Sequence, residues 1–184
     1  MRRLAAVVLL ALAIAAGQPG VADQTDARLD PLFAQLKAAD GVAAAEPIEA
    51  RIWQIWGQSG DAETDGMMAA GNMALATQDG EQALAAFDQV VRRAPNFAEG
   101  WNKRATTLYL LGRYLDSEAD IARVLALEPR HFGALSGLGL CEAQRDRLPE
   151  AVAAFQRALA VNPNMPGVIV NIRNLQAEIA KRSI

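Results

Sequence analysis

A period of 34 residues runs through most of this 184-residue chain and constrains its fold more than any other feature. Prolines, small residues and large apolar residues all recur at this step. Five sets of positions repeat in this way: Pro95, Pro129 and Pro163; Phe87, Ile121 and Phe155; Ala83, Ser117 and Ala151; Met67, Trp101 and Leu135; Gly71, Ala105 and Gly139. A period of this length is typical of arrays in which each unit buries its apolar face against the next.

Each unit reads as two helices joined by a turn. In the middle unit the first helix is "AEGWNKRATTLYLLG", which ends at Gly112, and the second lies in "RYLDSEADIARVLALEP", which stops before Pro129. Proline ends helices because it lacks the backbone N–H and clashes with the preceding turn. Small residues in the first helix let the second approach closely. We therefore expect an all-α solenoid of helix–turn–helix repeats.

These positions resemble the tetratricopeptide repeat, a 34-residue helix–turn–helix unit. The third unit carries the pattern most fully, with Leu135, Leu138, Gly139, Ala151, Phe155, Ala158 and Pro163. The middle unit departs at Arg104, where the pattern has leucine. A buried guanidinium must be paired, and the acids considered as partners are Asp120, Glu128 and Glu142. The phrases "EGWNKRATTLYLLGRY" and "LEPRHFGALSGLG" also resemble small exported bacterial repeat proteins.

The repeat register also suggests how the rest of the chain is organised. Phe33, Leu36, Trp53 and Trp56 fall one period before Met67, Ala70, Phe87 and Val90, so residues 29–60 read as a degenerate repeat that caps the array. The predicted segments are a signal at 1–22, an N-terminal helical segment at 23–63, repeats at 64–97, 98–131 and 132–165, and a capping helix at 166–184.

The N-terminus has the three parts of a secretory signal. Arg2 and Arg3 precede an uncharged run at residues 4–16, and Gly20 and Ala22 are placed as in a cleavage site. The run is shorter than the roughly 20 residues that a membrane-spanning helix needs. We expect cleavage after Ala22 and a periplasmic or secreted protein with no stable membrane span.

Composition excludes several classes of function. The formal charge of −3 becomes −5 when the two arginines of the signal are removed, which disfavours binding to nucleic acid. His131 and Cys141 are the only residues of their kinds, too few for an ordinary metal site or a catalytic constellation. Met67, Met68 and Met73 suit a core better than a copper or haem site. We expect no disulfide, no cofactor and no enzymatic activity.

The resemblance places a peptide-binding groove on the first helices of the repeats. The positions that it implies are Met68, Asn72, Glu99, Asn102, Lys103, Thr106, Tyr109, Ser136, Leu140 and Asn174. Asparagine can both donate to and accept from a peptide backbone. These positions could equally be solvated residues of an unoccupied face. A related groove holds a C-terminal carboxylate with cationic and amide side chains, but its five positions are here Met68, Asn72, Lys103, Gly133 and Gly137, of which only two are suitable.

We therefore expect a non-enzymatic scaffold of the bacterial envelope that binds a protein or peptide of unknown identity in its concave groove. Two alternatives from other classes remain open. The chain could be an accessory subunit or cryptic enzyme of an envelope complex. It could also be a structural component that uses its convex face.

Overall fold

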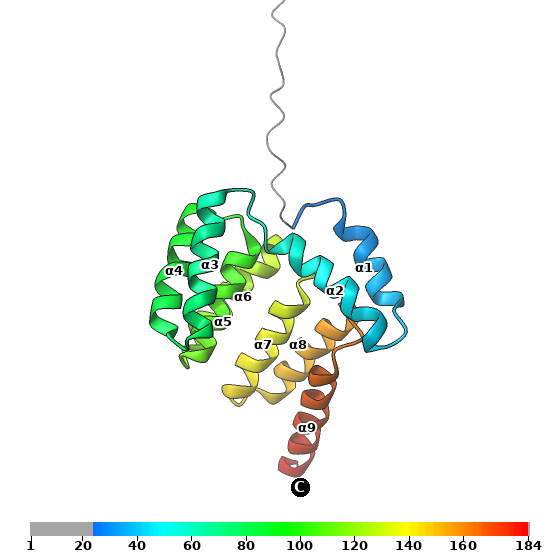
Figure 1. Ribbon diagram of the computed structural model, residues 1–184. Helices are drawn as coiled ribbons and strands as arrows, with labels where there is room; N and C mark the ends of the chain where they lie inside the picture. The colour runs from blue at the N-terminus through cyan, green and yellow to red at the C-terminus, as the bar shows by residue number, and fades with distance from the viewer. Residues whose placement is uncertain (1–23, 184) are drawn as a thin grey trace, which may run out of the picture.

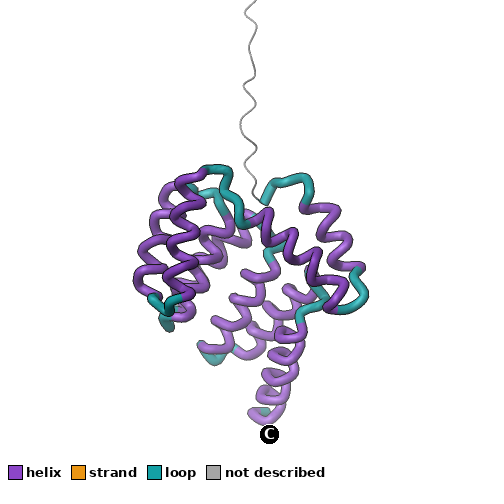
Figure 2. The backbone as a smooth tube through the Cα atoms, viewed as in Figure 1, coloured by secondary structure: helices purple, strands orange, loops and turns teal. Residues whose placement is uncertain are grey.

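The computed structural model describes residues 24–183, so the predicted signal at 1–22 lies outside the described residues. In this part of the chain all regular structure is α-helical (Figures 1 and 2). The helices are α1 (Leu29–Ala38), α2 (Val42–Trp56), α3 (Ala62–Ala76), α4 (Gly80–Arg93), α5 (Ala98–Leu110), α6 (Tyr114–Leu127), α7 (Phe132–Gln144), α8 (Leu148–Val161) and α9 (Pro166–Arg182). Among them, none has the length and apolar character needed to cross a membrane.

Six of the helices in residues 24–183 form three helix–turn–helix pairs. The pairs α3–α4, α5–α6 and α7–α8 each pack side by side, each pair packs against the next, and α9 covers α8. The first helices α5 and α7 of neighbouring pairs also contact each other, so we call the side of the first helices the inner side of the array and the side of the second helices the outer side. The prediction of an all-α solenoid of helix pairs is confirmed.

The turn inside each pair repeats with the same period as the helices. Gln78, Gly112 and Asp146 all have positive φ, at 61°, 75° and 60°. The following backbone N–H then reaches a carbonyl of the preceding helix, which is how a left-handed residue closes a helix end. These bonds run from Asp79 to Ala74, from Arg113 to Leu108 and from Arg147 to Glu142, at 2.8–2.9 Å.

Small and large residues are matched within each pair. A Cβ added to Gly71 would lie 2.5 Å from the Phe87 ring, and one added to Gly139 would lie 2.7 Å from the phenylalanine of its own repeat. In the middle repeat, Ala105 takes the place of the glycine and the smaller Ile121 takes the place of the phenylalanine. The extra carbon at one position is thus offset by a smaller side chain at the other.

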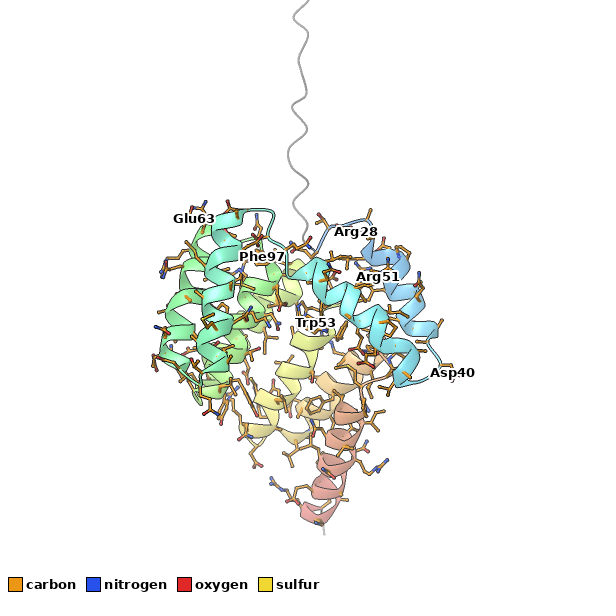
Figure 3. All side chains as sticks on the ribbon, viewed as in Figure 1. Arg28, Asp40, Arg51, Trp53, Glu63 and Phe97 are labelled. Carbon is orange, nitrogen blue, oxygen red and sulfur yellow. The ribbon has the colours of Figure 1, made fainter. Side chains whose placement is uncertain are left out.

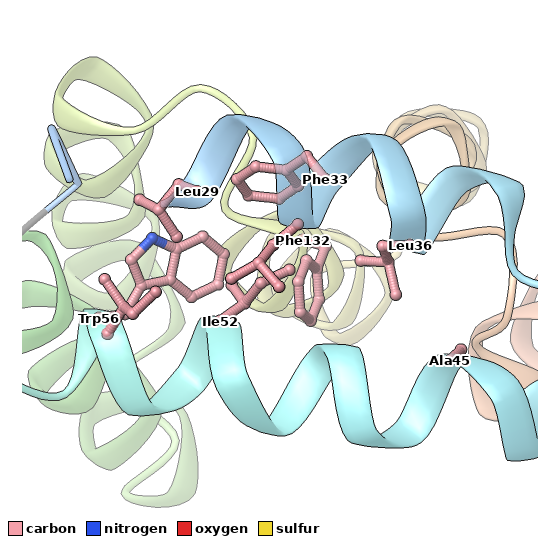
Figure 4. Close-up of a cluster of buried hydrophobic side chains, with 9 residues drawn as sticks. Leu29, Phe33, Leu36, Ala45, Ile52, Trp56 and Phe132 are labelled. Atoms are coloured by element: carbon pink, nitrogen blue, oxygen red, sulfur yellow. The ribbon is translucent and has the colours of Figure 1, made fainter. Parts of the chain in front are cut away.

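Helices α1 and α2 form a hairpin that does not extend the stack in front of α3. Its buried side chains, among them Leu29, Ile52 and Trp56, pack with Phe132 of α7 (Figure 4). A bend at residues 57–61 turns the chain, with Gly60 at φ 76°. The segment read from sequence as a degenerate repeat or cap is therefore helical, but it lies across the array instead of one repeat spacing before it.

Polar contacts fix this hairpin to the loops between repeats. Arg130, just before α7, donates to Asp30 at 2.6 Å. Asn162, just before α9, donates to Glu49 at 2.6 Å. Asn164 donates to the backbone carbonyl of Ala39, which lies between α1 and α2, at 3.2 Å. The hairpin therefore holds the loops that precede α7 and α9 from one side.

Candidate functional site

The predicted groove residues divide into three groups by exposure. Asn72, Thr106 and Asn174 are exposed, and Lys103, Tyr109, Ser136 and Leu140 are partly buried. Met68, Glu99 and Asn102 are buried. The set therefore does not form one continuous exposed surface.

Four of the ten residues meet at a pocket between α5 and α7, which we call the groove pocket. Its volume is about 70 Å³. It is lined by Asn102, Ala105, Thr106, Tyr109, Ser117, Ile121, Gly133, Gly137 and Leu140. Asn72 and Asn174 are not part of it. Asn102 and Tyr109 therefore border the same pocket, whereas Asn72, which was expected in the same groove, lies outside it.

Met68 is not in a position to line a groove. It is 5% exposed and packs with Phe87 and Phe97 in the core of the first repeat. The repeat pattern places it on the inner side of α3, but neighbouring aromatic side chains cover that position. The prediction that Met68 lines the groove is therefore wrong, and Met68 is a core residue.

Glu99 belongs to a buried polar cluster instead of the groove surface. His131 Nδ1 accepts a hydrogen bond from the backbone N–H of Ala134 at 3.1 Å, which makes this histidine the N-cap of α7. In the neutral ring the proton is then on Nε2, which lies 3.1 Å from Glu99 Oε2. Asn102 Nδ2 donates to the same oxygen at 2.9 Å, and Lys103 Nζ lies 3.5 Å from Oε1. The carboxylate therefore has three partners, as a buried charge requires.

Two tryptophans of α2 cover this cluster. The Trp56 ring stacks on His131 with centroids 4.1 Å apart and planes 6° apart. Trp53 extends from α2 toward α7 (Figure 3), where its indole lies over Gly133. A Cβ at Gly133 would be 2.5 Å from Trp53 Cη2. The hairpin thus covers His131, which is bonded to Glu99, and Gly133, which borders the groove pocket.

Arg104 forms a second charged cluster, on the side of α5 that faces α4 and α6. Its Nε and Nη2 each donate to a carboxylate oxygen of Asp120 at 2.7 Å. Its Nη1 donates to Asp88 at 2.9 Å, a partner that the sequence did not suggest. Its guanidinium lies 4.8 Å from the ring centre of Trp101. These bonds raise the pKa of Arg104 despite its partial burial.

The other two acids considered for Arg104 have different partners. Glu128 binds Arg130 at 3.1 Å, and Glu142 pairs with Arg147. Asp120 is thus the only one of the three proposed acids that contacts Arg104. Asp88 lies on α4, in the preceding repeat, where the pattern of the middle repeat alone does not point to it.

Cys141 has a structural environment. It is fully buried, and its Sγ lies 3.3 Å from Ser117 Oγ. Burial raises the pKa of this thiol, which keeps it protonated and a poor nucleophile. Among residues 24–183, histidine, cysteine and acidic side chains do not gather into a group that could hold a metal ion.

Comparisons with known proteins agree with this architecture. Residues 68–119 and 102–166 match the sequence profile of the tetratricopeptide repeat. A TPR repeat-containing protein of Rhizobium etli is 38% identical over 138 residues, which cover 74% of this chain and 67% of that protein. The small glutamine-rich tetratricopeptide repeat-containing protein 2 of Mycosarcoma maydis is 26% identical over 103 residues, 56% of this chain but only 29% of that protein.

Solved structures share the fold at lower sequence identity. The Sgt2 TPR domain from Aspergillus fumigatus has a TM-score of 0.64 and 19% identity, over 67% of this chain and 83% of that one. The first TPR of Spaghetti (RPAP3), bound to an HSP90 peptide, has a TM-score of 0.63 and 20% identity, over 65% and 96%. From its period, its paired helices and these similarities, the chain belongs to the tetratricopeptide repeat family.

Proposed function

We propose that this protein is a non-enzymatic scaffold that binds an extended segment of a partner protein along α5 and α7. The observation that carries the proposal is the groove pocket, where exposed Thr106 and partly buried Tyr109 and Leu140 surround a hollow on the inner side of the array. Recognition sites on a rigid scaffold are a common use of such surfaces. The bound peptide of the RPAP3 domain supports the general mode of binding.

Recognition of a C-terminal carboxylate is not part of this proposal. Such a site needs several charge-assisted hydrogen bonds. Met68 is buried in its repeat, and Gly133 and Gly137 carry no polar side chain. The ammonium group of Lys103 is already paired with the carboxylate of Glu99. We therefore propose an internal segment of the partner as the ligand.

The proposed location is the cell envelope, on the basis of the signal pattern at residues 1–22. The test is an intact-mass measurement on protein recovered from the native envelope fraction. Cleavage after Ala22 leaves Asp23 as the first residue. A mass that retains residues 1–22 would contradict both the cleavage and this argument for the location.

The binding face is tested by site-specific photo-cross-linking in the native host. A benzophenone amino acid is placed at Thr106, at the groove pocket, and in a matched variant at Arg157, which is exposed on α8 of the outer side. We expect a discrete cross-linked partner from position 106 and none from position 157. Cross-links from position 157 alone would overturn the groove proposal and favour a structural role for the convex face.

A further inference from the structure

We propose that the groove pocket accepts one branched aliphatic side chain of the partner, of the size of valine or leucine, while Asn102 Oδ1 accepts the backbone N–H of the same residue. This inference rests on the proposed function, because it names what the groove recognises. It adds a specificity-determining site that the repeat pattern alone does not contain.

The size and lining of the pocket select an aliphatic group. Two positions of α7, Gly133 and Gly137, have no side chain, and the space is bordered by Ala105, Ile121 and Leu140. The volume of about 70 Å³ is roughly half that of an apolar cavity of about 150 Å³ that accommodates benzene. The pocket therefore matches a branched chain of three or four carbons better than an aromatic ring.

The orientation of Asn102 supplies the polar half of the site. An ionised carboxylate can only accept hydrogen bonds, so the amide nitrogen of Asn102 must be the group that faces Glu99. This fixes Oδ1 on the other side of the amide. Within the described residues no donor reaches Oδ1, and Asn102 borders the pocket. The oxygen is thus a positioned acceptor that is open to solvent, and a ligand N–H can take the place of water there.

The buried cluster behind Asn102 keeps this acceptor in place. Glu99 is held by His131, and His131 is held by the backbone at the start of α7. Because Trp56 covers the histidine, water has little access to this chain of hydrogen bonds. Pre-orientation of this kind reduces the ordering cost of binding. The N-terminal hairpin therefore contributes to the site through Asn102, without contacting the partner's side chain.

Gly137→Ala is the variant that tests the pocket without harming the fold. A Cβ at this position would lie 3.5 Å from Ile121 Cδ1, an ordinary contact, so the methyl group fits while it occupies part of the pocket. Alanine also stabilises a helix interior relative to glycine by about 0.5–1 kcal/mol. Gly66→Ala is the matched control, because Gly66 is also helical and has no atom within 4 Å of an added Cβ.

The probes are N-acetyl-valine methylamide and its alanine and phenylalanine analogues, titrated at millimolar concentration while the amide NMR signals of the protein are followed. We expect the valine probe to shift the Gly137 backbone signal and the Asn102 side-chain signal, with the phenylalanine probe much weaker. Gly137→Ala should weaken the valine probe about tenfold, the usual effect of one methyl group in an apolar pocket. It should leave the alanine probe unchanged and raise the melting temperature. Gly66→Ala should raise the melting temperature only.

Three results would overturn the inference: no binding of the valine probe at the pocket, equal binding of the phenylalanine probe, or equal valine binding by Gly137→Ala. Failure of the proposed function looks different. If the partner still cross-links at position 106 while the valine probe fails, the scaffold function stands and the aliphatic site does not. If the probe binds as expected and nothing cross-links at position 106, the pocket stands and the scaffold function does not.

Discussion

The two charged clusters of α5 differ in the helices that surround them. Arg104 faces α4 and α6, and both of its acids are 16 residues away along the chain, one before it and one after it. Glu99 faces α7, with His131 32 residues away, and the cluster is covered by α2, which lies outside the repeats. The Arg104 cluster is thus internal to the solenoid, whereas the Glu99 cluster is also covered by the hairpin.

This difference decides how each cluster is exposed to water. The side chain of Glu99 is 3% exposed and that of His131 is fully buried. The Arg104 side chain is 22% exposed, and its second acid, Asp88, is 37% exposed. Solvent can therefore replace part of the Arg104 interactions but almost none of those at Glu99. We expect the cluster under the hairpin to be the more sensitive of the two.

The largest effect is expected for His131→Ala. It removes a hydrogen bond to the buried Glu99 carboxylate, worth roughly 1.5–3 kcal/mol, and also a fully buried ring, so the unfolding free energy should fall by roughly 3–5 kcal/mol. Urea denaturation measures the change. His131→Asn is the matched control, because asparagine can still cap α7, whose cap contributes about 1 kcal/mol, but cannot reach Glu99. If His131→Asn unfolds like the parent protein, the contact with Glu99 adds no stability and the contrast between the clusters is wrong.

The next effect concerns Arg104. Arg104→Ala should lower the free energy of unfolding by about 2–4 kcal/mol. This is less than for a fully buried pair, because the side chain is partly exposed. The repeat pattern alone predicts that leucine is well tolerated here, but Asp120 is 5% exposed and would be left unpaired. We now expect Arg104→Leu to be clearly destabilising as well. Adding Asp120→Leu should recover much of the loss in thermal denaturation. A single Arg104→Leu variant that melts like the parent would mean that water replaces the guanidinium.

A smaller effect tests whether the hairpin is seated on α7. Gly133→Ala forces a methyl group against Trp53, and such overpacking costs about 1–3 kcal/mol. In a Trp53→Ala background the obstruction is gone, so the same substitution should stabilise the helix by about 0.5–1 kcal/mol. A double-mutant cycle by denaturant unfolding reports the change of sign. Additive effects would show that the hairpin does not rest on this glycine in solution.

The smallest effect comes from an exposed pair outside both clusters. The hydrogen bond from Arg93, followed by those from Thr64, holds the pKa of Asp61 well below its usual range. A pKa that is lower in the folded state gives stability that is present above the unfolded value and is lost as pH falls through the folded value. The melting temperature of the parent should therefore fall more steeply below about pH 4 than that of Asp61→Asn, which keeps the cap of α3. Parallel curves for the two proteins would contradict this assignment.

The residues that sequence reasoning placed well are those whose partners lie within one repeat or the next. Gly71 and Phe87 could be matched because both recur at the same step. Asp120 could be proposed for Arg104 because it lies on the paired helix. Such contacts follow from helix geometry and a fixed turn, both of which the 34-residue period contains.

The residues that it misplaced depend on the hairpin or on packing between repeats. Glu99 occupies a position that is open in a bare repeat, but here it is buried and bonded to His131, on which Trp56 of α2 stacks. His131 carried a local signal, because it stands directly before an apolar helix where N-caps occur. No spacing rule connects it to Trp56, which lies 75 positions earlier, since the bend at residues 57–61 interrupts the register.

The position of the hairpin has a consequence for synthesis of the chain. Residues 29–56 are synthesised before Phe132, with which their apolar side chains pack, and the hydrogen bond from Asn164 to Ala39 joins positions 125 residues apart. Arrays with only neighbour contacts can fold as they emerge, whereas this chain must hold an apolar segment exposed until its last repeat appears. Nascent chains stalled before residue 128 should therefore present a chaperone-binding segment that the complete protein conceals.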